Sequence, residues 1–337
     1  MFFCYKKKEL RLIVSAEGRR VRNIFLGTVF VAFAQMAWAQ AWPEKPLRLI
    51  HGGGVGGNGD IISRLVAQQL GENLGQSVVV ESRPGAGQAI ALSAVAKSPP
   101  DGYTLVLVNA GLTVSTALNP KLPYNLMEDF SFISMVSSFP FVVAVAADSP
   151  FMNMNQLVEA ARRAPGKLSY ATPGVGTTQN LIGELINSST KVDIVHAAYT
   201  SATGPMIDLL GGRINVIVDS LTATSTQIKA GKIRVLGVTS AARWPGMPET
   251  PTLSEVIPGF EAMSWTGIAA PVNTPSPVVE RLNQELRSIV ATEAFKKRLE
   301  ALGSVAVSST RAELRNYIGG EVAKWKDVAK SAQLQLR

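Results

Sequence analysis

The chain has 337 residues, with 33 lysines and arginines against 25 aspartates and glutamates, and a formal net charge of +8. Residues 1–39 hold seven of these cations and two of the acids, so the rest of the chain is nearly balanced, with 26 cations against 23 acids. This near-neutral body, without basic clusters interleaved with aromatic residues, argues against a nucleic-acid partner. The single cysteine, Cys4, excludes a disulfide after the first 39 residues.

The first predicted element is a secretory signal peptide over residues 1–39. Cations dominate positions 1–23, an apolar run follows over Ile24–Ala34, and Ala37-Trp38-Ala39 forms a small-x-small cleavage signal. The run of 11 apolar positions is shorter than the ~20 residues that a membrane span needs. A twin-arginine signal at Arg19-Arg20 and a buried N-terminal helix are the alternatives. We therefore expect an exported, periplasmic protein.

The next element is a glycine-rich junction between a strand and a helix. A short apolar strand, Leu47–Ile50, leads into six glycines between Gly52 and Gly59, and an amphipathic helix is expected from about Asp60. Such a junction directs free backbone N–H groups and the positive end of a helix dipole at one point. It predicts an anion-binding site.

Three interpretations of this junction remain open. Residues 54–59 fit Gly-x-Gly-x-x-Gly, and Glu81 stands 22 positions after Gly59, as in dinucleotide-binding folds. An NAD-dependent oxidoreductase is therefore the alternative function. The turn could also have no ligand at all. We favour a cradle for a small carboxylate, because nicotinamide cofactors are scarce outside the cytoplasm and the leader predicts export.

Short Val/Ile-rich strands then alternate with helical patterns along the rest of the chain. This alternation predicts an α/β fold with strands covered on both faces. The expected strands are 47–50, 78–81, 105–108, 141–146, 192–194, 216–219, 235–239 and 267–270. The expected helices are 61–74, 89–97, 154–163, 178–188, 204–210, 224–230, 277–292 and 311–334.

A second junction of the same kind occurs at residues 169–180. Gly174 and Gly176 free the backbone, and Thr177 and Thr178 offer hydroxyls at a helix start. A plain threonine N-cap is the alternative. Two facing helix N-termini would hold both ends of a dicarboxylate, and each charge-assisted hydrogen bond contributes ~1.5–3 kcal/mol.

Two further polar residues end predicted strands, where open α/β sheets place their ligands. Asn109 follows Leu105–Val108, and Asp219 ends the run from Ile214. Asp219 is either a turn residue or a group that holds a water, hydroxyl or amino group of the ligand.

Catalytic and metal signals are weak. The two histidines, His51 and His196, have no metal-ligand spacing, and no nucleophile stands near a base in a recognisable motif. His51 either donates to an anion or is satisfied by backbone. We therefore expect no enzyme activity, no cofactor and no metal. An adhesion or assembly protein without a small ligand is a third class to consider.

Two proline-marked strands predict crossings between domains. The first runs from Ser138 through Pro140 into Val142–Ala146, and the second runs from Met263 into Gly267–Ala270. The predicted organisation is one domain of residues 42–142 plus 266–337 and a second of residues 143–265. Two linkers of this kind form a hinge in proteins that close over a ligand.

The order of these motifs resembles the Bug-type extracytoplasmic solute receptors, the substrate-binding subunits of tripartite tricarboxylate transporters. The resemblance covers nearly the whole chain after the leader. Its markers are residues 56–62 (GGNGDII), 79–87 (VVESRPGAG), 100–105 (PDGYTL), 208–212 (DLLGG), 228–232 (IKAGK) and 258–260 (PGF).

The resemblance implies a two-domain periplasmic binding protein of the Venus-flytrap type. Its two loops, here 52–60 and 172–178, would meet the ligand carboxylates through amides, hydroxyls and waters, and Asp219 matches a pocket aspartate. The chain departs from the family in the first loop, where Gly52, Gly54 and Val55 replace prolines. His51 replaces an apolar residue there, and Ser201 replaces a glycine.

The prediction is thus a monomeric receptor that captures a small organic carboxylate for a membrane transporter or a sensor. The ligand-binding residues expected are Gly56, Gly57, Asn58, Gly59, Asp60, Asn109, Ala110, Gly174, Thr177, Thr178, Tyr199 and Asp219.

Overall fold

A computed structural model describes residues 42–332, and the fold below is that of residues 45–332. The predicted signal peptide lies outside the described residues. In chain order the main elements are β1 (Leu47–His51), α2 (Asn58–Leu74), β2 (Val78–Ser82), α3 (Ala89–Ala96), β3 (Thr104–Asn109), α4 (Ala110–Leu118), β4 (Phe130–Ala146), α5 (Met154–Arg163), β5 (Ser169–Thr172), α6 (Thr178–Thr190), β6 (Val195–Ala198), α7 (Gly204–Leu210), β7 (Val216–Ser220), α8 (Leu221–Lys229), β8 (Ile233–Val238), β9 (Met263–Pro271), α9 (Ser276–Ala291), α10 (Glu293–Ala301), β10 (Val305–Ala306) and α11 (Arg311–Ala332).

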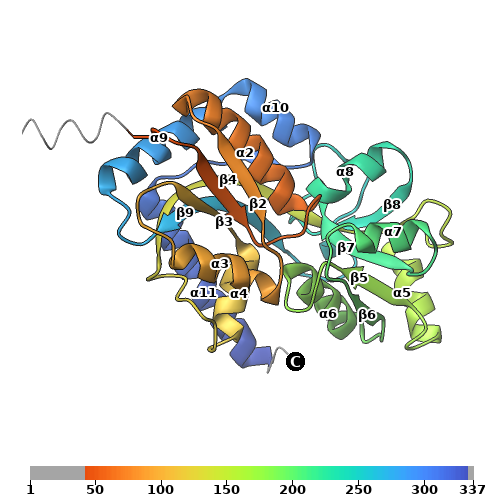
Figure 1. Cartoon of the computed structure of the whole chain (residues 1–337). Helices are drawn as coiled ribbons and strands as arrows, with labels where there is room; N and C mark the ends of the chain where they lie inside the picture. The colour runs from red at the N-terminus through yellow and green to blue at the C-terminus, as the bar shows by residue number, and fades with distance from the viewer. Residues whose placement is uncertain (1–41, 333–337) are drawn as a thin grey trace, which may run out of the picture. The chain divides into compact units, whose positions relative to one another are not determined.

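The strands form two groups joined by long antiparallel strands. The order is β2-β1-β3-β9-β4-β7-β5-β6, with β8 and β10 also paired to β4 (Figure 1). Strand β1 runs parallel to β2 and β3, and β5 runs parallel to β6 and β7. Each parallel group therefore has an edge where carboxyl ends of strands and N-termini of helices meet, the usual location of ligands in α/β proteins.

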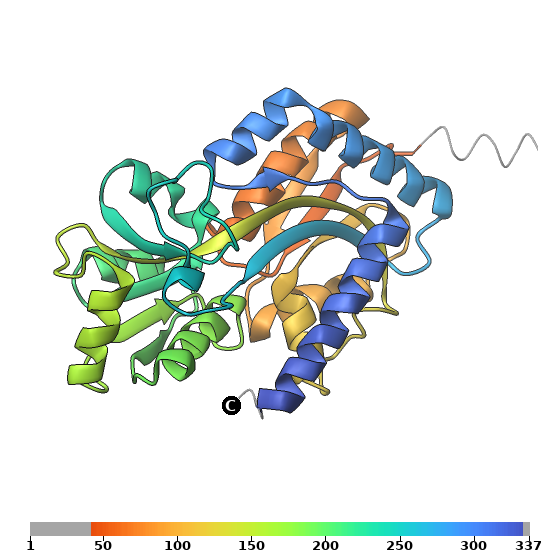
Figure 2. The same cartoon turned by 180° about the vertical axis from the view of Figure 1, so that it is seen from behind.

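Strand β4 belongs to both groups. Its first part, up to Pro140, pairs with β9, and its last part, from Phe141, pairs with β7 and β8. The two long strands β4 and β9 lie side by side (Figure 2). The chain thus changes from one group to the other at Pro140-Phe141, where the sequence predicts a crossing. The α/β, two-lobed architecture predicted from the sequence is confirmed, and we call the β1–β3 group the first lobe and the β5–β7 group the second.

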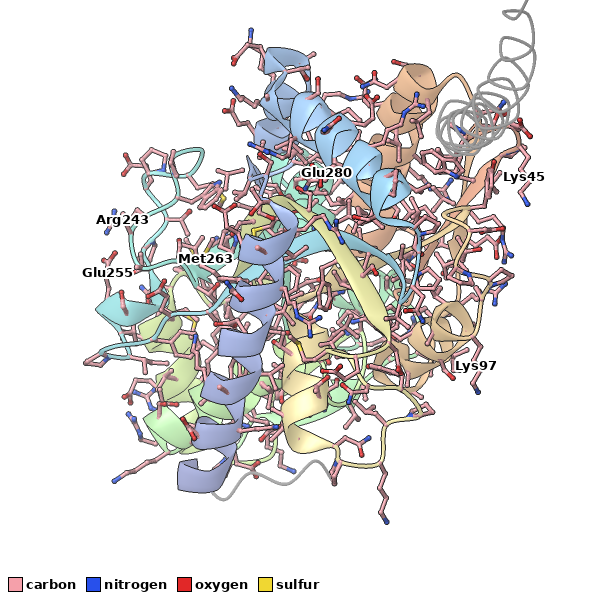
Figure 3. All side chains as sticks on the ribbon, turned by 90° about the vertical axis from the view of Figure 1, so that its left-hand side faces the viewer. Lys45, Lys97, Arg243, Glu255, Met263 and Glu280 are labelled. Atoms are coloured by element: carbon pink, nitrogen blue, oxygen red, sulfur yellow. The ribbon has the colours of Figure 1, made fainter. Side chains whose placement is uncertain are left out.

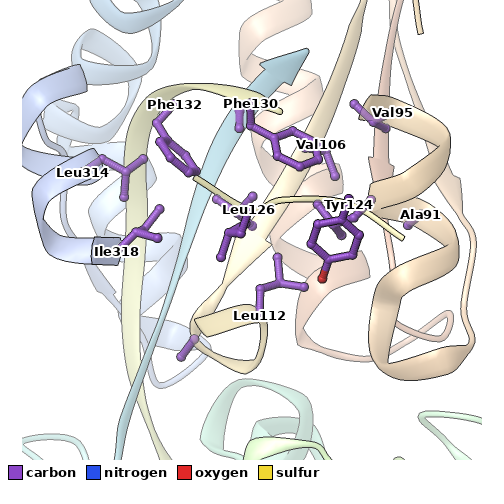
Figure 4. Packing of buried hydrophobic residues seen from close by; sticks show 14 of the residues in the cluster. Ala91, Val95, Val106, Leu112, Tyr124, Leu126, Phe130, Phe132, Leu314 and Ile318 are labelled. Carbon is purple, nitrogen blue, oxygen red and sulfur yellow. The ribbon is translucent and has the colours of Figure 1, made fainter. Parts of the chain in front are cut away.

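Each lobe has its own apolar core. In the first lobe, Leu112 of α4 and Phe130 of β4 pack in one cluster with Leu314 and Ile318 of α11 (Figure 4). In the second lobe, β4 and β7 contribute alternate residues to two clusters, with Val143 in one and Val142 in the other. Because residues alternate in a strand, both faces of the second sheet are covered. These cores fix the positions of the strand ends, and therefore of the glycine-rich loops that follow β1 and β5.

The element predictions fail at a few places. Strand β4 begins at Phe130 rather than near residue 141, because serines interrupt its apolar pattern. Two of these serines, Ser134 and Ser137, are buried but bonded, as in the 2.7 Å contact between the Ser137 and Thr266 hydroxyls. Helices α4 and α10 have no counterpart among the predicted elements, and β6 begins at Val195 rather than at residue 192. Within the described part of the chain, no helix has both the length and the apolar character needed to cross a membrane.

Candidate functional site

One cavity of about 420 Å³ collects loops from both lobes. Its wall is built by the first glycine loop (residues 52–57), the loop 84–88, the start of α4, the second glycine loop (residues 173–177), residues 198–202 and the end of β7. Phe139 and Phe141 of the crossing strand complete it. A volume of this size suits a small metabolite.

Five helices of the described chain begin at this cavity. Their N-cap residues all line it, and they are Gly57 of α2, Gln88 of α3, Asn109 of α4, Thr177 of α6 and Ser220 of α8. Each helix start offers amide groups and the positive end of a dipole. The residues that line the cavity include no lysine, arginine or histidine. The charged side chains labelled in Figure 3, such as Lys45 and Lys97, project outward. An anion in this cavity would therefore be held by amides and hydroxyls.

The first glycine loop is fixed from beneath by an aspartate. Gly56 adopts a φ of 80°, and its amide donates to Asp60 Oδ2 at 3.0 Å. Asp60 Oδ1 lies 2.9 Å from the guanidinium of Arg64 and 3.3 Å from Nε2 of His51. Asp60 and His51 are both buried. The Asp60 carboxylate thus supports the loop from behind and does not face the cavity.

Burial shifts the pKa values of Asp60 and His51 in opposite directions. Burial raises the pKa of Asp60, but hydrogen bonds from Arg64 and the Gly56 amide outweigh it and hold the pKa below the usual value. Burial lowers the pKa of His51, and the attraction of Asp60 does not offset this effect. At neutral pH the pair is therefore an ionised Asp60 beside a neutral His51.

The first glycine loop also contacts the second lobe directly. A Cβ on Gly54 would lie 2.8 Å from the amide nitrogen of Ala202, and one on Gly57 would lie 2.9 Å from the Cβ of Ala202. Real Cβ atoms do not approach this closely. The two glycines therefore let the loop pack against residues 200–203 across the cavity.

The second glycine loop is fixed by a neutral network. Gly176 adopts a φ of 72°, and its amide donates to Asn180 Oδ1 at 3.1 Å. The Thr177 hydroxyl caps α6 by accepting from the Asn180 amide at 3.2 Å and donates to Gly174 O at 2.8 Å. Behind the loop, His196 Nδ1 lies 3.2 Å from Asn180 Nδ2 and its Nε2 lies 2.7 Å from the Thr172 hydroxyl. Burial lowers the pKa of His196.

Asp219 is the acidic side chain in the cavity wall. Its Oδ1 accepts from the Ser220 amide at 2.7 Å and from Gln179 Nε2 at 3.3 Å. Burial raises the pKa of Asp219 to about 6 despite these bonds. Among residues 42–332 no cation offsets its charge, so it suits a ligand group that donates a hydrogen bond.

The structure brings together nine of the twelve residues expected at the site. Three of the twelve do not line the cavity: Gly56 and Asp60, which support the first loop from behind, and Ala110, which is buried at the start of α4. The hydroxyl of Tyr199 is bonded to Asp208 at 2.6 Å. The nine that line the cavity are Gly57, Asn58, Gly59, Asn109, Gly174, Thr177, Thr178, Tyr199 and Asp219.

Sequence reasoning missed one whole wall segment, residues 84–88. Its signal was present, since Pro84-Gly85-Ala86-Gly87 follows β2 at the same edge as the first glycine loop.

The dinucleotide interpretation requires a Glu81 carboxylate that is free to bind a ribose hydroxyl. Both Oε atoms of Glu81 are bonded, one of them to Arg83 at 3.0 Å and the pair of them to Arg48. Among the described residues, no group of three His, Cys, Asp or Glu side chains is arranged to hold a metal ion.

The family model described as the tripartite tricarboxylate transporter family receptor matches residues 62–334. The chain belongs to this receptor family. A UPF0065 protein from the tcbD-tcbE intergenic region of Pseudomonas sp. strain P51 is 36% identical over 310 residues, 90% of this chain and 92% of that protein. The R. palustris protein Rpa4515, solved with adipate, is 31% identical with a TM-score of 0.84, covering 87% of this chain and 99% of that one.

The periplasmic binding protein BugD is 32% identical with a TM-score of 0.83, again covering 87% of this chain and 99% of its own. The Bug-type resemblance noted from the sequence is thus confirmed, and the family comprises binding receptors rather than enzymes. The family match begins two residues after Asp60. The first glycine loop lies just before it.

Proposed function

We propose that this receptor captures a small organic dicarboxylate between its two lobes, in the periplasm, for uptake by a tripartite tricarboxylate-type transporter or for sensing. The observation that carries the proposal is the convergence of five helix N-termini on one cavity whose wall has no cationic side chain. Anions are the ligands that such a wall stabilises. The adipate bound to the related R. palustris protein supports the same class.

The proposed ligand site consists of the nine cavity-lining residues given above, with Gly56 and Asp60 as supports of the first loop and Ala110 at the base of α4. The proposed first lobe consists of residues 42–142 and 266–337. The proposed second lobe consists of residues 143–265. Support for this division comes from β4, whose partners change at Pro140-Phe141. Closure would then bend the chain at β4 and β9.

Binding is tested by thermal shift and calorimetry with mono-, di- and tricarboxylates. A ligand at 100 times its Kd raises the free energy of unfolding by about 2.7 kcal/mol. At least one dicarboxylate should do so. If no carboxylate shifts the transition while NAD(H) does, the oxidoreductase alternative replaces this proposal. If nothing shifts it, an assembly protein without a small ligand becomes the better interpretation.

Thr178 offers a direct test of the second loop. Its side chain is buried in the wall and its hydroxyl makes no hydrogen bond to the described residues. Thr178→Ala should therefore weaken dicarboxylate binding about tenfold, equal to about 1.4 kcal/mol, and leave the unfolding transition of the free protein unchanged. Thr190→Ala, at the far end of the same helix, is the matched control, and its affinity should stay at the wild-type value. An unchanged Kd for Thr178→Ala would remove this hydroxyl from the site.

Asp219 would select ligands that carry a donor group. We infer that its carboxylate accepts from a ligand hydroxyl, so malate should bind more tightly than succinate. The Asp219→Asn variant should reduce this preference. A preference for succinate in the wild type would show that Asp219 does not contact a ligand donor.

The cellular location and partners are part of the same proposal. The leader over residues 1–39 should direct export, and the receptor should act as a monomer that meets a membrane transporter or a sensor. N-terminal sequencing of the protein from the periplasmic fraction would test the leader. A protein retained in the cytoplasm with its first residues intact would contradict it.

A further inference from the structure

The loop at residues 85–88 has an unusual backbone and no role in the function proposed above. Its four residues have consecutive positive φ angles, 125° at Gly85, 47° at Ala86, 60° at Gly87 and 76° at Gln88. For Ala86 and Gln88 this left-handed conformation is unfavourable, and it persists only where surrounding contacts impose it. Such strain next to a ligand cavity is worth explaining.

The contacts that hold Gln88 begin at the first glycine loop. A Cβ on Gly52 would lie 2.4 Å from the Cβ of Gln88 and 2.8 Å from its Cα. Gly52 thus leaves the space that Gln88 occupies. Because a side chain at position 52 would displace Gln88, the glycine there has a packing function as well as any function towards a ligand.

The Gln88 side chain pairs with Asn109 through both of its polar atoms. Gln88 Nε2 donates to Asn109 Oδ1 at 3.0 Å, and Asn109 Nδ2 donates to Gln88 Oε1 at 3.0 Å. Asn109 is the N-cap of α4 and has the extended backbone of an N-cap residue, yet it makes no side-chain capping bond. Asparagine is a favoured N-cap because its side chain accepts from the second or third amide of the helix. Here those amides belong to Gly111 and Leu112.

The start of α4, which has no side-chain cap, faces an unpartnered hydroxyl from the other lobe. A Cβ on Gly111 would lie 3.2 Å from Asn109 Oδ1, 3.4 Å from Gln88 Nε2 and 3.7 Å from the hydroxyl of Thr178. Thr178 is only 6% exposed, lines the cavity and makes no hydrogen bond to the described residues. Because Thr178 lines the cavity, its hydroxyl is available to a ligand group that enters there. The hydroxyl and the uncapped amides therefore indicate one and the same ligand group.

We propose that Gln88 is a positioning residue that holds the Asn109 carboxamide away from the N-terminus of α4, so that the Gly111 and Leu112 amides remain free for a ligand carboxylate that also meets Thr178. This inference rests on the proposed function. Gln88 itself need not touch the ligand. It acts by keeping the Asn109 side chain from competing with the ligand for the amides at the start of α4.

The test is a cycle of three variants with succinate and adipate as probes, measured by calorimetry. Gln88→Ala should raise the Kd about tenfold, because Asn109 can then cap α4 and compete with the ligand. Asn109→Ala removes the side chain that Gln88 holds, and it is the reference for the second step of the cycle. Adding Gln88→Ala to Asn109→Ala should change the Kd by less than about threefold. If Gln88→Ala weakens binding as much in the Asn109→Ala background as in the wild type, Gln88 acts by direct contact or by supporting the loop, and the proposal is overturned.

A second measurement does not depend on any ligand. Amide hydrogen exchange in the free protein should slow about tenfold at Gly111 or Leu112 in Gln88→Ala, since Asn109 caps the helix there, and should return to the wild-type rate in the double variant. Unchanged exchange at both amides would overturn the inference. If neither probe binds the wild type while exchange behaves as expected, the dicarboxylate proposal fails but the role of Gln88 stands.

Discussion

The two glycine loops have the same backbone design but different supports. Residues 54–62 read GVGGNGDII and residues 174–182 read GVGTTQNLI, so the pattern Gly-Val-Gly-x-x-x-Asp/Asn-Ile/Leu-Ile occurs in both. In each, a left-handed glycine donates its amide to the side chain four residues later. A histidine lies beside that side chain, buried at the first loop (His51) and half-buried at the second (His196). The same local sequence thus builds the same turn in each lobe.

The supports differ in charge. The first loop depends on Asp60, which is ionised and paired with Arg64, and it presents no hydroxyl cap. The second depends on neutral Asn180 and on the Thr177 cap. The first loop thereby exposes almost only backbone to the cavity, whereas the second adds hydroxyls. We infer that the first loop contributes amides and closure and that the second contributes side-chain selectivity.

The largest expected effect is on the free energy of unfolding, and it distinguishes Asp60 from Asn180 as supports of the two loops. Asp60→Ala should lower the free energy of unfolding by about 3 kcal/mol, because it removes a buried carboxylate that serves an amide, Arg64 and His51. Asn180→Ala should lower it by about 1.5 kcal/mol, since only neutral hydrogen bonds are lost. Urea unfolding at pH 7.5 measures both, with Asp148→Ala on an exposed turn as the control. Equal losses at the two positions would show that the charge of Asp60 adds nothing.

The second prediction compares the two acids. Asp60 has a lowered pKa, but the pKa of Asp219 is raised from 3.8 to about 6, so the folded state binds this proton more tightly than the unfolded chain. The ionised form of Asp219 therefore costs stability, and this cost develops as the pH rises from 4 to above 6. Asp219→Asn should raise the free energy of unfolding of the free protein by about 2 kcal/mol at pH 7.5.

The gain from Asp219→Asn should shrink towards zero at pH 4, where the wild-type side chain is protonated. Unfolding curves of both proteins at the two pH values provide the check. A gain of the same size at pH 4 would mean that burial of the charge is not the cause.

The third prediction concerns closure through the first loop. Gly57→Ala places a Cβ only 2.9 Å from the Cβ of Ala202, so the packing of the first loop against residues 200–203 is disfavoured. Dicarboxylate affinity should fall about tenfold, equal to about 1.4 kcal/mol. Adding Ala202→Gly should restore most of it. Gly320→Ala, where a Cβ meets nothing within 4 Å, is the control. Calorimetry measures the dicarboxylate affinity of each variant. If the double variant binds as weakly as Gly57→Ala, the contact with Ala202 is not the cause of the loss.

The smallest expected effect is the pH dependence of the first support. Burial lowers the pKa of His51, so the unfolded chain binds a proton that the folded state rejects, and stability falls as the pH drops below 6.5. His51→Leu should lose less stability than the wild type between pH 7.5 and pH 5. His196 should contribute in the same direction from the second loop. Parallel curves for His51→Leu and the wild type would show that His51 is not the source.

Much of the fold could be predicted because most strands after residue 45 are short, apolar and flanked by glycine-containing loops. Strand β4 escaped full prediction, since its buried serines hide the apolar pattern and find partners on other segments, as Ser134 does on Ser309 at 3.0 Å. The loop 84–88 escaped for a similar reason. Its conformation depends on Gly52 and Asn109, which are distant in the sequence.

The sequence by itself determined the two glycine turns, the helices that follow them and the receptor family, because glycine freedom and helix capping act over a few neighbouring residues. Only the tertiary structure decided which way each side chain faces. Asp60 looks like a ligand residue in the sequence but lies beneath its loop, and Gln88 gave no signal yet stands beside Asn109. Such orientations follow from packing between segments far apart in the chain, where burial and hydrogen bonding select one arrangement among several that are locally allowed.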